Sequence, residues 1–255
     1  MKIIDLSVTI DSEIPSDPPM LMPKIEILDH VKNREEMMKF FGLTKVEDLP
    51  EGNAWGTDWI TLTSHAGTHL DSPWHFYPTM NGGEPAWTID EVPLEWCIGN
   101  GVVADFSDKP AGYLIQPEDF EGYFKRKEYT LKSGDIVLLM SGAAKKWGTK
   151  EYISSGCGVS KKATLWLIDQ GVRVMGTDAW GWDVPLAIAA QRFKETGDPS
   201  IIWEGHRAGR EKAYCHLEKL ANLDLLPLTG FTVICLPVKI KRGSAGWTRA
   251  IALFE

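Results

Sequence analysis

The sequence predicts an α/β fold in which helices cover a largely buried β-sheet. Short apolar runs rich in valine, isoleucine and leucine, such as residues 135–140, recur along the chain, and segments with helical spacing lie between them. Strands that are apolar without interruption are buried on both faces, which is typical of sheets covered by helices. The length of 255 residues is enough for one large domain with a full hydrophobic core.

The expected elements follow one another along the whole chain. Residues 1–7 read as a first strand, and the proline-rich stretch 11–24 as an extended loop. Ser160 is expected to cap a helix that stops at Gly171, and Gly42 to end a short amphipathic helix that covers a site or a partner subunit. Helices are expected at 32–42, 117–127, 160–170 and 185–195, and further strands at 58–63, 101–106, 135–140, 172–178, 231–238 and 249–254.

Composition and charge exclude several classes of function. The net charge of -8 provides no basic surface for nucleic acid and disfavours anionic membranes. No apolar run approaches the roughly 20 residues of a membrane span, and the N-terminus lacks the features of a signal peptide. The cysteines form no C-x-x-C pair, so we expect free thiols in a reducing cytoplasm. They are Cys97, Cys157, Cys215 and Cys235.

The strongest chemical signal is a dense group of ligand-type side chains in the pattern H-x3-H-x-D-x3-H. Its members are His65, His69, Asp71 and His75. Gly67 and Pro73 interrupt this stretch, so a loop that leaves the strand at 58–63 is expected rather than one regular helix. A lone histidine is usually an ordinary surface or core residue, but four such side chains at this density favour a metal site. Zinc, manganese and iron accept imidazole nitrogen and carboxylate oxygen as ligands.

Other sources of chemistry are absent or weaker. The sequence contains no G-x-S-x-G, G-x-x-x-x-G-K-[ST], G-x-G-x-x-G or H-E-x-x-H motif. Cys157 remains an alternative nucleophile. Residues 205–220 hold a second set of possible ligands, and their spacing does not choose among them; the alternative is a solvated helix over 210–220 with charge pairs four residues apart. This set consists of His206, Glu211, His216 and Glu218.

Residues 65–76 resemble the signature H-x-G-T-H-x-D-x-P-x-H-F of the metal-dependent cyclase family, which includes bacterial kynurenine formamidase and isatin hydrolase. The resemblance continues in residues 4–7, 134–138 and 176–178, and in His206-Arg207 followed by Glu218. It implies that residues 1–255 form a single α/β domain. The implied core is a mixed, barrel-like β-sheet flanked by helices, of the swivelling β/β/α type.

The same resemblance implies roles for individual residues. His75 becomes the general acid/base, and the implied metal ligands are His65, His69, Asp71, His206 and Glu218. A glutamate at the last position favours two zinc ions, because a second carboxylate can bridge two cations; isatin hydrolase has glutamine there and holds one manganese. Residues 180–205 look longer than in a compact formamidase and nearer to isatin hydrolase.

The implied reaction is hydrolysis of the C–N bond of an amide, formamide or lactam of an aromatic small molecule, by metal-activated water. The alternative is a metal-dependent lyase, dehydratase or cyclase on the same fold. Trp74 and Phe76 flank His75, and Trp180 follows a strand end, so we expect these three to contact the substrate. The alternative is that they anchor the core or an interface. The resemblance also suggests a homodimer or homotetramer.

Overall fold

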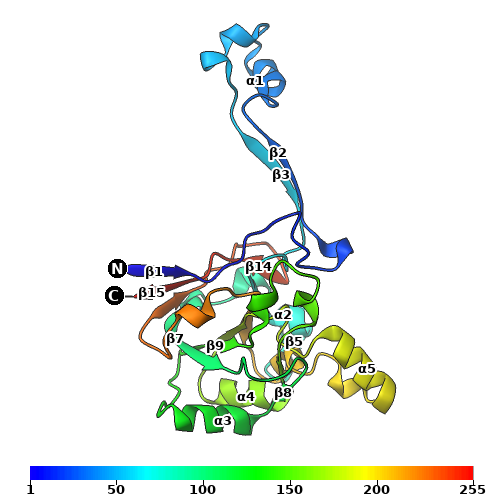
Figure 1. Ribbon diagram of the computed structural model, residues 1–255, viewed down its shortest axis with the longest axis vertical. Helices are drawn as coiled ribbons and strands as arrows, with labels where there is room; N and C mark the ends of the chain where they lie inside the picture. The colour runs from blue at the N-terminus through cyan, green and yellow to red at the C-terminus, as the bar shows by residue number, and fades with distance from the viewer. Residues whose placement is uncertain (255) are drawn as a thin grey trace.

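The computed structural model describes residues 1–254, and its centre is one nine-stranded sheet (Figure 1). In spatial order, its strands are β1 (Lys2–Asp5), β15 (Ile251–Phe254), β13 (Thr232–Ile234), β7 (Ile98–Asp105), β9 (Ile136–Met140), β11 (Val174–Thr177), β12 (Cys215–Glu218), β4 (His69–Asp71) and β14 (Ala245–Trp247). The four central strands β7, β9, β11 and β12 run parallel, and the outer pairs are antiparallel.

The sheet is curled. Ser7, which follows the edge strand β1, forms an antiparallel bridge with Leu220, which follows β12 far along the strand order. The amide of Ala221 also donates to the carbonyl of Leu6. An edge strand can reach the end of such a distant strand only if the sheet bends round. The predicted mixed, barrel-like sheet is therefore confirmed, as an open half-barrel.

Both faces of the sheet are buried, which explains the unbroken apolar strands. Along β9, Val137 and Leu139 join a cluster on the face covered by α3 (Pro117–Arg126) and α4 (Lys161–Asp169). Ile136 and Leu138 point into a second cluster on the concave side. The predicted helices and cap are confirmed, because the Ser160 hydroxyl accepts a hydrogen bond from the amide of Ala163 at 3.1 Å.

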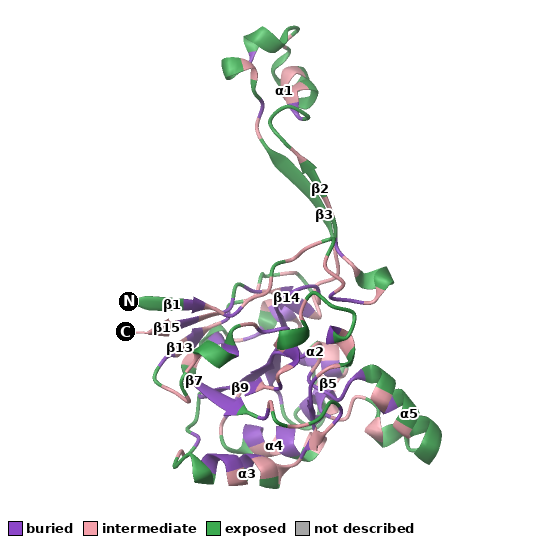
Figure 2. Cartoon of the chain, in the orientation of Figure 1, coloured by how far each residue is buried: buried purple, intermediate pink, exposed green. Residues whose placement is uncertain are grey.

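An arm projects from this body (Figures 1 and 2). It is an antiparallel ribbon of β2 (Lys24–Leu28) and β3 (Thr57–Thr61) that carries α1 (Arg34–Phe41) near its tip. Gly42 ends α1 with a φ of +67°, as its position predicted. The strand expected at 58–63 thus exists as β3, but it belongs to the arm and not to the main sheet.

The remaining elements lie outside the main sheet and the arm. They are the helices α2 (Pro73–Phe76) and α5 (Leu186–Thr196), the strands β5 (Thr79–Met80), β6 (Glu84–Pro85), β8 (Leu114–Ile115) and β10 (Gly158–Val159), and several single 3-10 turns, including η9 (His206–Arg210). Within residues 1–254, we find no helix with the length and apolar character needed to cross a bilayer.

Candidate metal centre

The first histidine motif lies partly in the main sheet. Its central residues form β4, which pairs with β12 on one side and β14 on the other. Because successive strand residues point to opposite faces, His69 and Asp71 share one face while Leu70 packs into the concave core. The expectation of a loop is therefore wrong for these three residues and for α2, and it holds for residues 64–68 and for Ser72. Sheet pairing on both sides fixes the two ligand-type side chains.

The second segment places its ligand-type residues beside the first. In the β12–β4 register, His216 lies opposite Asp71 and Glu218 lies opposite His69. The alternative of a solvated helix over 210–220 is wrong, since β12 is buried. Glu211 is not part of the group, and pairs instead with Lys161 on the surface. Alternation of polar residues with Cys215 and Leu217 was the sequence signal for a strand with one polar face.

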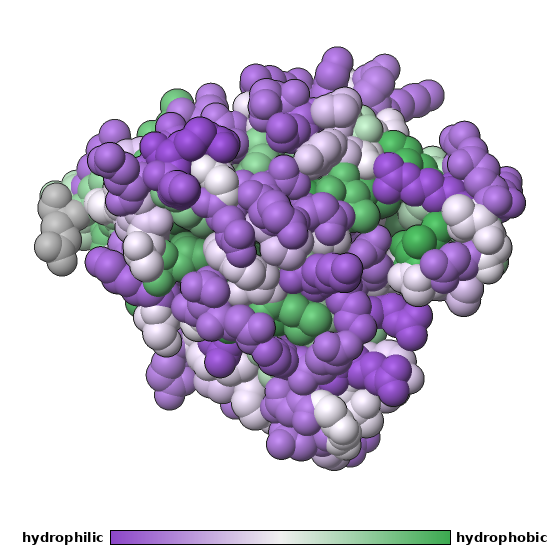
Figure 3. All heavy atoms as spheres, turned by 90° about the horizontal axis from the view of Figure 1, so that it is seen from below, coloured by the Kyte–Doolittle hydropathy of each residue, from purple (hydrophilic) through white to green (hydrophobic). Residues whose placement is uncertain are grey.

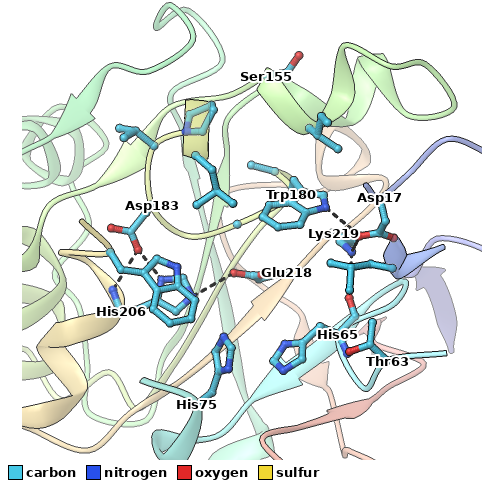
Figure 4. Close-up of a pocket in the computed structure, with 18 residues that line it drawn as sticks. Asp17, Thr63, His65, His75, Ser155, Trp180, Asp183, His206, Glu218 and Lys219 are labelled. Atoms are coloured by element: carbon cyan, nitrogen blue, oxygen red, sulfur yellow. Dashed lines mark hydrogen bonds and ion pairs between the residues drawn. The ribbon is translucent and has the colours of Figure 1, made fainter. Parts of the chain in front are cut away.

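The five side chains predicted as ligands form one connected group, of which Figure 4 shows His65, His206 and Glu218 at the pocket. The His65 Nδ1 and His69 Nε2 atoms lie 2.9 and 3.3 Å from Asp71 Oδ1. The carboxylate of Glu218 lies 3.5 Å from His69 Nε2 and 3.6 Å from His206 Nε2. A tetrahedral ion with bonds of about 2.0–2.1 Å would hold its ligand atoms about 3.3–3.4 Å apart. Most of these separations are long for hydrogen bonds but match a shared cation.

Buried atoms of this group lack partners in the protein. Both carboxylate oxygens of Asp71 and the Nε2 atom of His69 are fully buried, yet none has a hydrogen bond of acceptable geometry to any described residue. Such groups are costly to bury alone, and orphaned polar atoms are rare in folded proteins. A divalent cation among them would satisfy all three atoms, so the residues fit a metal.

Each of these imidazoles is oriented through its other nitrogen. The partners are Ser244 Oγ for His65 (2.9 Å), the Gly67 carbonyl for His69 (2.9 Å) and the Asp183 carboxylate for His206. Asp183 also accepts hydrogen bonds from the amides of Gly205 and His206, so it is held rigidly. Outer partners of this kind fix the tautomer and the ring angle of metal-binding histidines.

The charges of the group are balanced by protons when no cation is present. Burial favours neutral imidazoles, but the Asp71 and Glu218 carboxylates outweigh burial and raise the pKa of His69 to about 9. The same two carboxylates raise the pKa of His216 to about 9 against the effect of burial. Two buried carboxylates thus face two imidazolium groups, and a divalent cation carries the charge that those two protons supply.

His75 lies between the ligand group and a pocket. Its Nε2 atom is 3.8 Å from Asp71 Oδ2, and its ring meets the edge of Trp203 at a centroid distance of 4.9 Å. Burial lowers the pKa of His75 to about 3, with help from the nearby His206 and His65 and against the Asp71 carboxylate. The imidazole is therefore neutral at neutral pH.

The pocket beside His75 has a volume of about 260 Å³ and mainly apolar walls. Trp180 and Trp203 form part of these walls, and Glu218 reaches the floor. Trp180 Nε1 donates to Asp17 at 2.9 Å, and the buried Lys219 pairs with the same carboxylate. Trp203 and Lys219 both have a φ of +58°, a conformation that non-glycine residues adopt rarely and often at functional sites.

Two aromatic residues expected to contact substrate lie elsewhere. Trp74 is 48% exposed and does not line the pocket, while Phe76 is buried and stacks on Tyr214 and His216 beneath the ligand group. The reason is that α2 is a single helical turn, in which neighbouring residues point about 100° apart and cannot share the face of His75. Trp180 does line the pocket, and so does Trp203, which the sequence did not single out.

The cysteines take no part in this chemistry. All four are free and buried, as expected. Burial raises the pKa of Cys157 to about 12, so its thiol stays protonated and is a poor nucleophile.

Comparison with known proteins places this chain. Residues 4–184 match the sequence model of the Cyclase family, described as "Putative cyclase". The kynurenine formamidase of Erythrobacter litoralis is 26% identical over 214 residues, 83% of each chain. The isatin hydrolase of Roseibium aggregatum is 24% identical over 213 residues, 80% of this chain and 76% of the other.

Solved structures share the fold. Isatin hydrolase A from Ralstonia solanacearum superposes with a TM-score of 0.78 at 22% identity, over 100% of this chain and 92% of the other. Isatin hydrolase A from Labrenzia aggregata, bound to benzyl benzoate, gives 0.75 at 24% identity, over 100% and 94%. Because the family match covers well over half of the sequence and the fold agrees throughout, the chain belongs to the Cyclase family.

Proposed function

We propose that this protein is a metal-dependent hydrolase that cleaves the C–N bond of an amide, formamide or lactam of an aromatic small molecule. One observation carries the proposal: the metal-ligand side chains form one connected group, and three of them, His65, His206 and Glu218, line an apolar pocket together with His75. Relatives named kynurenine formamidase and isatin hydrolase support the same reaction class.

The cation position is defined by the residues around it. His65, His69, Asp71, His206 and Glu218 would together hold the bound metal. When bound there, a divalent cation supplies a water of lowered pKa and polarises the carbonyl group of the substrate. We favour two zinc ions, because Asp71 and Glu218 provide two carboxylates that can bridge and neutralise a pair of cations; manganese is the second candidate.

The protein side chains then position the substrate and move the proton. His75 lies beside the ligand group and lines the pocket, so it would take a proton from the attacking water and return it to the leaving nitrogen. Trp180 and Trp203 can hold a flat ring against the pocket wall, since both line it. The hydrogen bond from Trp180 to Asp17 fixes the indole, and a fixed indole limits the orientations that the substrate ring can take.

We further propose that the chain forms a homodimer or homotetramer through its arm. The arm exposes large apolar side chains, including Ile27 (65%), Trp59 (68%) and Phe40 (74%), and a two-stranded ribbon is marginally stable alone. By contrast, the face of the body opposite the arm is mainly hydrophilic, with small scattered apolar spots (Figure 3). The free, buried thiols support a reducing cytoplasm as the compartment.

A direct assay tests the proposed reaction. Metal-free protein is reconstituted with zinc or manganese and is then supplied with N-formylkynurenine and with isatin. We expect metal-dependent release of a carboxylate product from at least one of the two. Turnover without uptake of water into the product would instead favour the lyase, dehydratase or cyclase alternative, and metal-independent turnover would overturn the proposal.

A further inference from the structure

His216 occupies the same buried group but has no role in the ligand set described above. Its Nε2 atom lies 3.1 Å from Asp71 Oδ2 and 3.2 Å from Glu218 Oε1. Its ring is held between two aromatic rings, with centroids 4.9 Å from Phe76 and 5.8 Å from Trp182 and interplanar angles near 20°. The imidazole is therefore locked with one nitrogen facing both carboxylates.

The other ring nitrogen of His216 has a hydrogen-bond partner in the protein, as do those of His65, His69 and His206. Its Nδ1 atom lies 3.3 Å from the Tyr214 hydroxyl, and that hydroxyl donates its own proton to the Gly205 carbonyl at 3.1 Å. The hydroxyl must then accept from His216, so Nδ1 carries a proton. A neutral His216 consequently presents the lone pair of Nε2 to two carboxylates, which is the arrangement found around a cation.

Four side chains together enclose this point. One ligand atom each from Asp71, His206, His216 and Glu218 lies within 4.8 Å of the other three. Asp71 faces His65 and His69 through Oδ1 but faces His216 through Oδ2, so its two oxygens address different neighbours. A carboxylate placed in this way can bridge two cations.

We propose that His216 is a metal ligand and completes a four-ligand position with Asp71, His206 and Glu218. This inference rests on the proposed metal-dependent function and extends it. Four protein ligands leave no open coordination position, which is typical of structural rather than catalytic ions. An ion held there would anchor Asp71 and Glu218, and His65 and His75 line the pocket beside it.

Metal binding by a matched set of variants tests the proposal. His216→Asn removes the ligand, and His30→Asn is the control, because His30 lies in the arm near α1 and its side chain bonds the Ala54 carbonyl there. Metal-free wild type and both variants are titrated with Co²⁺, and bound metal, affinity and the visible absorption of Co²⁺ are measured. We expect wild type and His30→Asn to bind two ions, and His216→Asn to lose affinity for one of them by about 100-fold with an altered spectrum.

A measurement on the wild type covers the case in which His216→Asn does not fold. With ¹⁵N-labelled histidine, zinc should move the Nε2 resonance of His216 to the position of a metal-bound nitrogen and leave His30 unchanged. An Nε2 of His216 that keeps its proton after zinc saturation would overturn the proposal, as would a folded His216→Asn that binds both ions like wild type. Absence of hydrolysis in protein with a metal-bound His216 would instead refute only the proposed reaction.

Discussion

The candidate metal centre and the arm differ in how far apart in the sequence their residues lie and in how deeply those residues are buried. The candidate metal centre joins residues 65–75 with residues 206–218. Its residues His69, Asp71, His206 and Glu218 are buried, and only His65 and His75 are partly exposed, at the pocket. The arm is built from neighbours in sequence, and both strands of its ribbon are largely exposed (Figure 2). The candidate metal centre therefore places charged side chains in the interior, whereas the arm places large apolar side chains in contact with water.

In each region, some side chains lack a partner within the chain itself. Unpartnered carboxylate oxygens in the interior indicate a cation, whereas unpartnered apolar side chains on a ribbon indicate another protein surface. Each region is thus completed by a different kind of partner. A substitution in one region should therefore leave the function of the other unchanged.

The largest effect should come from Asp71. Replacing Asp71 with Ala removes the one carboxylate that faces His65, His69 and His216 together. Loss of an outer partner alone costs about 10–100-fold in metal affinity, so loss of this ligand should cost more than about 100-fold. Elemental analysis of the purified variant checks the metal content; wild-type stoichiometry would remove Asp71 from the ligand set.

His75 should affect turnover without affecting metal binding. His75→Ala is expected to lower kcat by about 10²–10⁴-fold, which is the usual contribution of a general acid/base. Metal content should stay at the wild-type level. Trp74→Ala is the matched control on the same helical turn, and its kcat and KM should not change because Trp74 lies outside the pocket. Native turnover in His75→Ala would show that another group moves the proton.

Asp183 should affect metal affinity indirectly, through its contact with His206. Asp183→Asn keeps the shape but weakens the contact with His206 Nδ1, so metal affinity should fall by about 10–100-fold. Calorimetric titration of metal-free protein gives the affinity directly. An unchanged dissociation constant would mean that the amides and packing around His206 orient it without this carboxylate.

The arm should control assembly only. Trp59→Ser removes an exposed apolar side chain from β3, and we expect it to shift the protein toward a smaller species in sedimentation or light scattering. Leu225→Ser, at an apolar position of the body that is 58% exposed, is the control and should not shift it. Metal content should match wild type in both variants. Equal behaviour of the two would show that the ribbon is not the association surface.

The smallest expected effect is the release of protons when the metal binds. The pKa values of His69 and His216 are raised to about 9 without a cation, so both are protonated at pH 7. Metal binding requires them neutral, and therefore must release protons near pH 7 and tighten as the pH rises toward about 9. Calorimetry in buffers of different ionisation enthalpy counts the protons. Zero release at pH 7 would mean that neither imidazole binds the metal.

The sequence predicted the parts of this molecule that depend on local chemistry. The H-x3-H-x-D-x3-H spacing indicated the ligands, and apolar runs together with Ser160 and Gly171 located strands and α4 correctly. The curl of the sheet, the arm and the inclusion of His216 depend on pairing between distant strands. Only the β12–β4 register brings His216 opposite Asp71. The spacing of the ligand-type residues in 205–220 did not choose among them, although the alternation around Cys215 and Leu217 was a signal for a strand.

Anomalous X-ray scattering from zinc-loaded crystals tests the central claim most directly. The account predicts a peak at the absorption edge of zinc within bonding distance of Asp71 and Glu218, with histidine nitrogens completing the coordination. An active crystal with no such peak, or with its only peak away from these two carboxylates, would contradict it.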